Sequence, residues 1–190
     1  MTEFRLAIVS SLTLLIGCGG GDPEPVLPAG PPAYLALAIE TLDLSDKTLA
    51  LLDSGPIAVP PPSDATFDGV MIVLDDADPD FGGYVGDFSA TYTFATETLD
   101  GDATGFFYDG STDPAVASTG TPVAGTVTVD GSGIVSDVIA VTLGGMLGSD
   151  AVTGTGDALF LGADGDMVFV EALGVTIGTR STMGVLVLAD

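Results

Sequence analysis

Hydrophobic and polar positions alternate with a period of two through most of the chain after residue 62. Runs rich in Val, Ile, Thr, Phe and Tyr recur between short stretches of Gly, Asp, Ser and Pro, a texture typical of short antiparallel strands joined by tight turns. The pattern predicts eight strands, at about residues 65–74, 84–95, 103–108, 123–129, 133–143, 152–161, 166–172 and 183–188.

Three segments that contain Asp-Gly predict hairpin turns, at residues 99–102, 129–133 and 163–166. Glycine adopts a positive φ without steric penalty, which is what tight hairpin turns require. Within residues 84–95 the alternation slips, and this irregularity predicts a β-bulge near Gly86.

Consecutive strands leave two exposed sheet edges unless the sheet closes on itself. Closure into a barrel removes both edges, whereas a sandwich leaves them to be protected in another way. Glycines inside several strands suit the sharp bends of a small barrel. We therefore expect an all-β fold, with a single small antiparallel β-barrel of about eight strands over residues 63–190. A membrane-spanning barrel is disfavoured because the strands are too short and irregular to give an apolar outer band.

Residues 34–52 depart from the period of two. Apolar residues recur there at helical spacing, at Leu35, Ile39, Leu42, Leu49 and Leu52. Such spacing predicts a helical stripe, with Ser45 placed to cap a second short turn. We expect a short helical or irregular segment over residues 33–62, ahead of the barrel.

The N-terminus has the three parts of a secretory signal: Arg5, an apolar run over residues 6–16, and the small residue Gly17. Eleven helical residues would span roughly 16 Å, which is too short for a bilayer core of about 30 Å. We expect residues 1–17 to be a signal peptide. Residues 18–32, rich in Gly and Pro, form neither a regular helix nor a strand ladder and are expected to be a flexible tether.

Cys18, the only cysteine, follows Leu15-Ile16-Gly17 directly. This run resembles the lipobox of bacterial lipoproteins, which implies that the Cys18 sulfur carries a diacylglyceryl group. The alternative is an ordinary secretory signal with an incidental cysteine. We expect a lipid-anchored protein of the bacterial cell envelope, in the outer rather than the inner membrane, with the leaflet left open.

The chain is strongly acidic, with 27 Asp and Glu residues against three Lys and Arg and a net charge of −24. After the expected cleavage only Lys47 and Arg180 remain as cations. Such a charge repels nucleic acid, so we expect no nucleic-acid partner. It is consistent with a solvated surface adapted to a saline environment, or with attraction of cations.

The chain contains no histidine, which excludes a Ser-His-Asp triad and histidine ligation of a metal. We expect a protein that is not an enzyme and that carries no resident cofactor. The tyrosines are expected in the core or at the rim rather than as haem ligands. Oxygen ligands at high density can hold Ca²⁺, and the candidate ligands are Asp75, Asp76, Asp78 and Asp80. That loop lacks the glycine and the distal glutamate of an EF-hand, so a solvated turn is the alternative.

Four segments resemble a known family: SDATFDGV at 63–70, YVGDFSATYTF at 84–94, LDGDATGF at 99–106 and VAGTV at 123–127. They are similar to the successive strands of the small β-barrel domain of transferrin-binding-protein-B-like lipoproteins. The segments at 152–158 and 184–189 depart from the pattern of that family's later strands. The resemblance implies surface display and binding rather than catalysis, and no ligand-contacting residue can be carried over.

These observations predict a lipid-anchored envelope protein that presents an acidic barrel to an unidentified ligand or partner protein. The alternative is a structural or exclusion lipoprotein, encoded for example by a phage or mobile element, with no small-molecule ligand. An apolar pocket would favour binding, whereas a barrel filled by its own side chains, with one flat exposed apolar face, would favour the alternative. An enzyme would need a cleft that holds two carboxylates at working distance.

Overall fold

A computed structural model describes residues 32–54, 60–74, 82–109, 120–182 and 184–190. The helix is α2 (Pro32–Ser54), and the strands are β1 (Ala65–Leu74), β2 (Gly83–Thr93), β3 (Thr98–Asp109), β4 (Thr121–Pro122), β5 (Gly125–Val135), β6 (Val138–Leu147), β7 (Asp150–Leu161), β8 (Met167–Ala172), β9 (Thr176–Ile177), β10 (Arg180–Ser181) and β11 (Gly184–Ala189).

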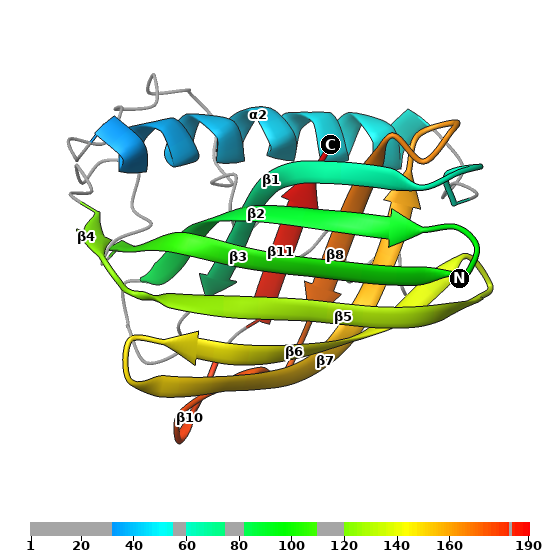
Figure 1. Ribbon diagram of the computed structural model, residues 1–190. Helices are drawn as coiled ribbons and strands as arrows, with labels where there is room; N and C mark the ends of the chain where they lie inside the picture. The colour runs from blue at the N-terminus through cyan, green and yellow to red at the C-terminus, as the bar shows by residue number, and fades with distance from the viewer. Residues whose placement is uncertain (1–31, 55–59, 75–81, 110–119, 183) are drawn as a thin grey trace.

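Eight of these strands form a closed antiparallel barrel in the order β7-β6-β5-β3-β2-β1-β11-β8, and β8 pairs with β7 to complete the circle. The short strands β4, β9 and β10 extend the sheet at β3 and β7. Helix α2 lies across the outside of the barrel (Figure 1). The predicted fold class, one small barrel of about eight strands preceded by a helical segment, is confirmed.

Each expected strand overlaps an observed strand, but β3 begins five residues before the strand expected at 103–108, and β5 continues six residues beyond the strand expected at 123–129. Strand β1 begins and ends where the pattern predicts. The strand expected at residues 133–143 is wrong, because a turn at Ser136 and Asp137 divides it between β5 and β6. Both turn residues have positive φ, 54° and 68°. Two successive positive φ angles are typical of a type I′ hairpin, and this hairpin achieves them without glycine.

Two of the three predicted Asp-Gly turns are also wrong. Residues 99–102 lie inside β3, and residues 129–133 lie inside β5, whereas residues 163–166 do connect β7 to β8. Gly101 faces the barrel interior, where a Cβ would lie 2.7 Å from Cζ of Phe88; at Gly131 a Cβ would lie 2.7 Å from Cγ2 of Ile139. These glycines therefore make room for core side chains, while the neighbouring aspartates point to solvent.

Helix α2 is continuous through Ser45, so the predicted cap at that residue is wrong. The predicted stripe is right only in part: Leu49 and Leu52 pack against the cluster between helix and barrel, whereas Ile39 and Leu42 are 41% and 47% exposed. The buried residues of the face that contacts the barrel are Tyr34, Leu37, Leu44, Ser45 and Thr48. Apolar residues occur all round this helix, so its sequence does not single out one face. Thr48 can lie buried because its hydroxyl donates a hydrogen bond to the Leu44 carbonyl at 2.7 Å.

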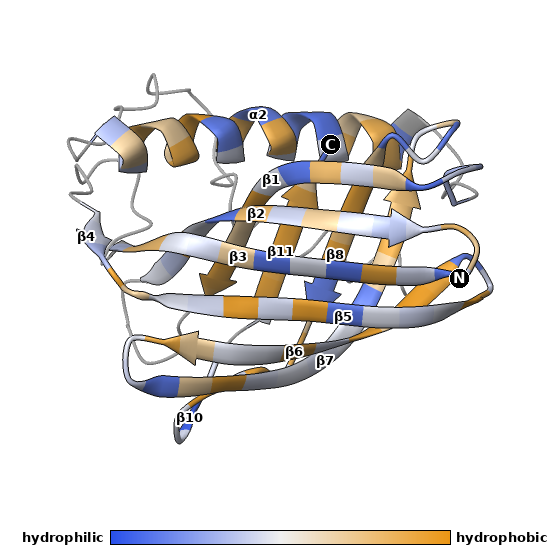
Figure 2. Ribbon diagram, in the orientation of Figure 1, coloured by the Kyte–Doolittle hydropathy of each residue, from blue (hydrophilic) through white to orange (hydrophobic). Residues whose placement is uncertain are grey.

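Two hydrophobic clusters hold the molecule together. One fills the barrel interior, and the other lies between α2 and the outer faces of β1, β7, β8 and β11. Strands β8 and β11 are therefore buried along their whole length. By contrast, β2 alternates between buried and solvent-facing residues, and hydrophobic and hydrophilic residues alternate visibly along β5 in the same front wall (Figure 2). Among the described strands, those of the wall away from the helix present a broad solvent-facing surface.

Candidate functional site

The residues predicted from sequence to carry lipid or metal, Cys18 and the aspartates at 75, 76, 78 and 80, lie outside the described residues. So do the predicted signal peptide and the tether up to residue 31. Among the residues that are described, no group of three or more acidic, cysteine or histidine side chains is arranged to hold a metal ion. The described helix is not long and apolar enough to cross a membrane.

The barrel interior is filled by its own side chains. The rings of Tyr92 and Phe160 meet edge to face with centroids 4.9 Å apart, and Phe67 lies 5.8 Å from Phe160. Valines and other aliphatic residues from every strand of the barrel complete this cluster. The described interior is therefore a packed core, and a ligand site has to be sought on the outside.

A groove of about 740 Å³ lies between the N-terminal half of α2 and the barrel wall at β2, β3 and β4. Its lining is formed by Ala33, Ala36, Leu37, Glu40, Asp87, Gly105, Phe106, Phe107, Pro122, Val123 and Ala124. Nine of these eleven residues are apolar, and the two carboxylates are the only ionisable groups. The volume lies within the range of about 300–1,000 Å³ typical of small-molecule sites.

A β-bulge in β3 builds one wall of this groove. Val85 pairs with Phe107 and Asp87 pairs with Thr104, so β3 advances three residues while β2 advances two. The bulge predicted near Gly86 is thus confirmed in position, although the extra residue belongs to β3. Gly105, with φ of +62°, allows the irregular backbone.

The bulge also reverses which side chains point outward. Before it, Ala103 faces the core; after it, Phe106 faces the core and Phe107 faces the helix. A Cβ added to Gly86 would lie only 2.6 Å from Cδ1 and Cε1 of the Phe106 ring, so the inward position of Phe106 requires glycine at residue 86. If β3 alternated regularly from Ala103 with Gly105 included, Phe107 would point into the barrel; because the bulge takes up Gly105, Phe107 faces the helix and forms the floor of the groove.

Tyr34 fixes the first turns of α2 against this wall. Its ring is 2% exposed and lies 5.7 Å from the Phe107 ring at a tilt of 54°. On its other side, a Cβ on Gly120 would come within 2.3 Å of Cγ of Tyr34. The ring is therefore held between Phe107 and bare backbone, which sets the width of the groove.

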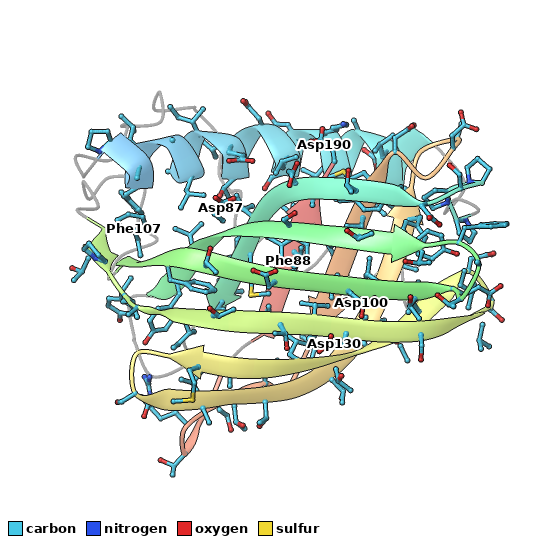
Figure 3. All side chains as sticks on the ribbon, viewed as in Figure 1. Asp87, Phe88, Asp100, Phe107, Asp130 and Asp190 are labelled. Carbon is cyan, nitrogen blue, oxygen red and sulfur yellow. The ribbon has the colours of Figure 1, made fainter. Side chains whose placement is uncertain are left out.

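Glu40 and Asp87 line the groove from the helix and from β2, and Figure 3 labels Asp87 on the side of the barrel that faces the helix. Burial raises the pKa of Glu40, and the carboxylates of Asp87, Asp190 and Asp68 raise it further. Lys47 forms an ion pair with Asp190 nearby. Among the described residues, neither Glu40 nor Asp87 has an ion pair or a side-chain hydrogen bond, so this end of the groove is negative and uncompensated.

Carboxylates also oppose one another elsewhere on the wall. Asp100 on β3 lies directly opposite Asp130 on β5, and both are exposed (Figure 3). Asp157 on β7 lies opposite Glu171 on β8, beside a smaller hollow of about 540 Å³. That hollow is lined by residues of the neighbouring strands β6, β7 and β8 and by Leu173, whereas the larger helix groove lies between a helix and the barrel wall. The helix groove is therefore the better candidate site.

The tyrosines occupy core and rim positions, as expected. Tyr34 and Tyr92 are buried, and burial raises the pKa of Tyr92. Tyr84 and Tyr108 are half-buried on neighbouring strands, with ring centroids 5.0 Å apart.

The sequence analysis missed Glu40, Asp87 and Phe107 as site residues. For Phe107 a signal exists: two adjacent phenylalanines at 106 and 107 break the alternation of β3, and such a break indicates a bulge. For Glu40 and Asp87 no local signal exists, because both are single acids in a chain with many acids. Only the packing of α2 on the barrel brings them together.

Comparison with protein-family models and with curated proteins finds no match for this chain. The resemblance to transferrin-binding-protein-B-like lipoproteins stays a prediction from the four sequence segments.

Proposed function

We propose that this chain is a lipid-anchored protein of the bacterial envelope that binds a small ligand, or part of a partner, in the groove between α2 and the barrel. The observation that carries the proposal is the groove itself, about 740 Å³ of mostly apolar surface beside a barrel whose described interior is packed. A packed barrel provides a rigid wall, and the helix provides the second side of the site.

The position of the predicted anchor supports this arrangement. Residue 18 is separated from Pro32, the first residue of α2, by a segment that can extend at most about 50 Å. The groove is lined by the first turns of the same helix. A lipid on Cys18 would therefore keep the groove near the membrane surface.

Labelling of cells with a clickable fatty acid tests the anchor. The wild-type chain is expected to incorporate the label, and Cys18→Ser is expected to abolish it. Equal labelling of the two proteins would contradict lipidation at Cys18.

The chemistry of the groove favours binding over catalysis. Two carboxylates could serve as acid and base, but among the described residues the other lining side chains offer no hydroxyl, amide or cation to orient a polar substrate. Enzymes position their substrates through such groups. We therefore propose no reaction for the site.

Native mass spectrometry of the full chain tests binding. A molecule retained from the envelope is expected on the wild type and should be lost from Ala36→Leu, which narrows the groove. Ala50→Leu is the matched control, because Ala50 is exposed on the same helix outside the groove lining. A bare mass for the wild type would count against a ligand.

The filled interior supports a second candidate, a structural or exclusion lipoprotein with no small-molecule ligand. In that case Ala36→Leu should leave the function in the cell intact, whereas substitutions on exposed surfaces should impair it. Exposed apolar residues of the described chain, such as Phe94 and Val135, are then the places to begin.

A further inference from the structure

The groove combines an apolar body with a negative end. The apolar part comes from two separate elements: Ala33, Ala36 and Leu37 on the helix and Phe107 and Val123 on the wall. Glu40 and Asp87 add two carboxylates to the same cavity. A molecule that fills this space needs an apolar body and, beside it, a group that matches negative charge.

The protein does not supply that positive charge from its described residues. Lys47 is paired with Asp190, and the Arg180 guanidinium donates to the Tyr84 hydroxyl at 3.5 Å. These are the only cations in the chain after residue 5. Placing a cation between Glu40 and Asp87 would relieve their mutual repulsion, and in a partly apolar environment such a contact is stronger than in water.

We infer that the groove binds a small amphiphile with an apolar body and one ammonium group. This inference rests on the proposed function of the groove and names the class of its ligand. An alkylammonium fits better than a metal ion, because the described residues hold no cluster of three metal-ligating groups and because most of the lining is apolar. It also fits better than an anion, which both carboxylates would repel.

The ionisation of Glu40 gives the binding a defined pH dependence. Its pKa is raised by burial and then by Asp87 on β2, by Asp190 after β11 and by Asp68 on β1, while Lys47 on the same helix is paired with Asp190. An ammonium group is attracted to the ionised carboxylate of Glu40 and not to its neutral, protonated form. Binding should therefore weaken as the pH falls through the raised pKa of Glu40, while an alkylammonium stays charged throughout.

Isothermal titration calorimetry of the full chain with three probes of equal length tests the inference: n-octylammonium, octan-1-ol and octanoate. At pH 7 we expect octylammonium to bind most tightly and octanoate least. Glu40→Gln and Asp87→Asn should each weaken octylammonium by about threefold to fivefold and leave octan-1-ol unchanged. Asp102→Asn is the control, because it removes an exposed aspartate from the neighbouring strand outside the groove, and it should change binding less than twofold.

The outcomes separate this inference from the function on which it rests. If Ala36→Leu weakens both octylammonium and octan-1-ol while Glu40→Gln and Asp87→Asn change neither, the groove binds apolar molecules and the ammonium preference is wrong. If Ala36→Leu changes the binding of no probe, the groove is not a binding site and the proposed function fails with the inference. If Asp102→Asn weakens octylammonium as much as Glu40→Gln, the acidic surface attracts cations without a specific site, and the inference is again overturned.

Discussion

The facing carboxylates of Asp100 and Asp130 lead to a quantitative prediction about how this acidic barrel depends on salt. Directly opposite residues in an antiparallel pair have Cβ atoms about 4.5–5.5 Å apart, so the two charges lie roughly 6 Å apart. Both side chains are exposed, and in water Coulomb's law gives a repulsion of about 0.7 kcal/mol at that distance. Screening reduces it to about 0.6 kcal/mol at 10 mM salt and to about 0.1 kcal/mol at 1 M.

A double-mutant cycle isolates this repulsion. Asp100→Asn and Asp130→Asn should each raise the free energy of unfolding, and the double variant should gain about 0.6 kcal/mol less than the sum of the single gains at 10 mM salt. Unfolding is measured with urea, which is uncharged and does not screen. At 1 M NaCl the coupling should nearly disappear.

Asp100 and Asp150 form the matched control cycle. The register of the strands places Asp150 three strands away from Asp100 and displaced along the barrel, a separation of roughly 20 Å, so their coupling should be below about 0.1 kcal/mol. A coupling between Asp100 and Asp130 no larger than that of the control would refute the reasoning. A coupling of opposite sign would refute it too, since it would mean that the two carboxylates stabilise each other through a shared proton or cation.

Three further predictions test the core, the helix and the groove. Gly101→Ala should lower the free energy of unfolding by about 1–3 kcal/mol through overpacking against Phe88, more than Gly144→Ala, where φ is not positive and a Cβ would make an ordinary contact at 3.5 Å with Oγ1 of Thr128; equal losses in urea unfolding would argue against a packing role. Tyr34→Ala should cost about 3–5 kcal/mol, and Tyr34→Phe should retain most of that stability because the ring contact with Phe107 remains; a similar loss in both variants would show that the ring is not what holds the helix. Glu40→Gln should raise the urea midpoint at pH 7, because ionisation of a group whose pKa is raised in the folded state lowers stability as the pH rises through that pKa. This gain should shrink toward pH 4, and a gain that is constant with pH would exclude the carboxylate as its cause.

The barrel could be predicted from sequence because side-chain alternation and edge protection are properties of neighbouring residues and of strand number. The predictions that were wrong, such as the Asp-Gly turns, concern features that depend on contacts between segments distant in the sequence. Asp-Gly is a turn signal when glycine needs positive φ, but Gly101 is required because Phe88 occupies the space of its Cβ. Nothing near Gly101 in the sequence reveals this.

The buried face of α2 was in part predicted incorrectly, for a similar reason. Its apolar residues lie on every side, so periodicity alone could not distinguish the face with Ile39 and Leu42 from the face with Leu37 and Leu44. The face of α2 that becomes buried is determined by the barrel, because β1, β8 and β11 present a second apolar surface outward against which the helix packs. The groove follows from that choice, which is why Glu40 and Asp87 could not be paired in advance.

Gly105 gives β3 a tolerance to changes in length that a regular strand lacks. If a lineage lost this residue, Gly86 would pair with Phe106 between the pairs Val85–Phe107 and Asp87–Thr104, and Phe106 would still face the core while Phe107 faced the helix. Loss of one residue from a regular part of a strand instead turns every following side chain to the opposite face of the sheet. The core and the groove can therefore survive a one-residue deletion at the bulge, where the same deletion in a regular strand would exchange their side chains.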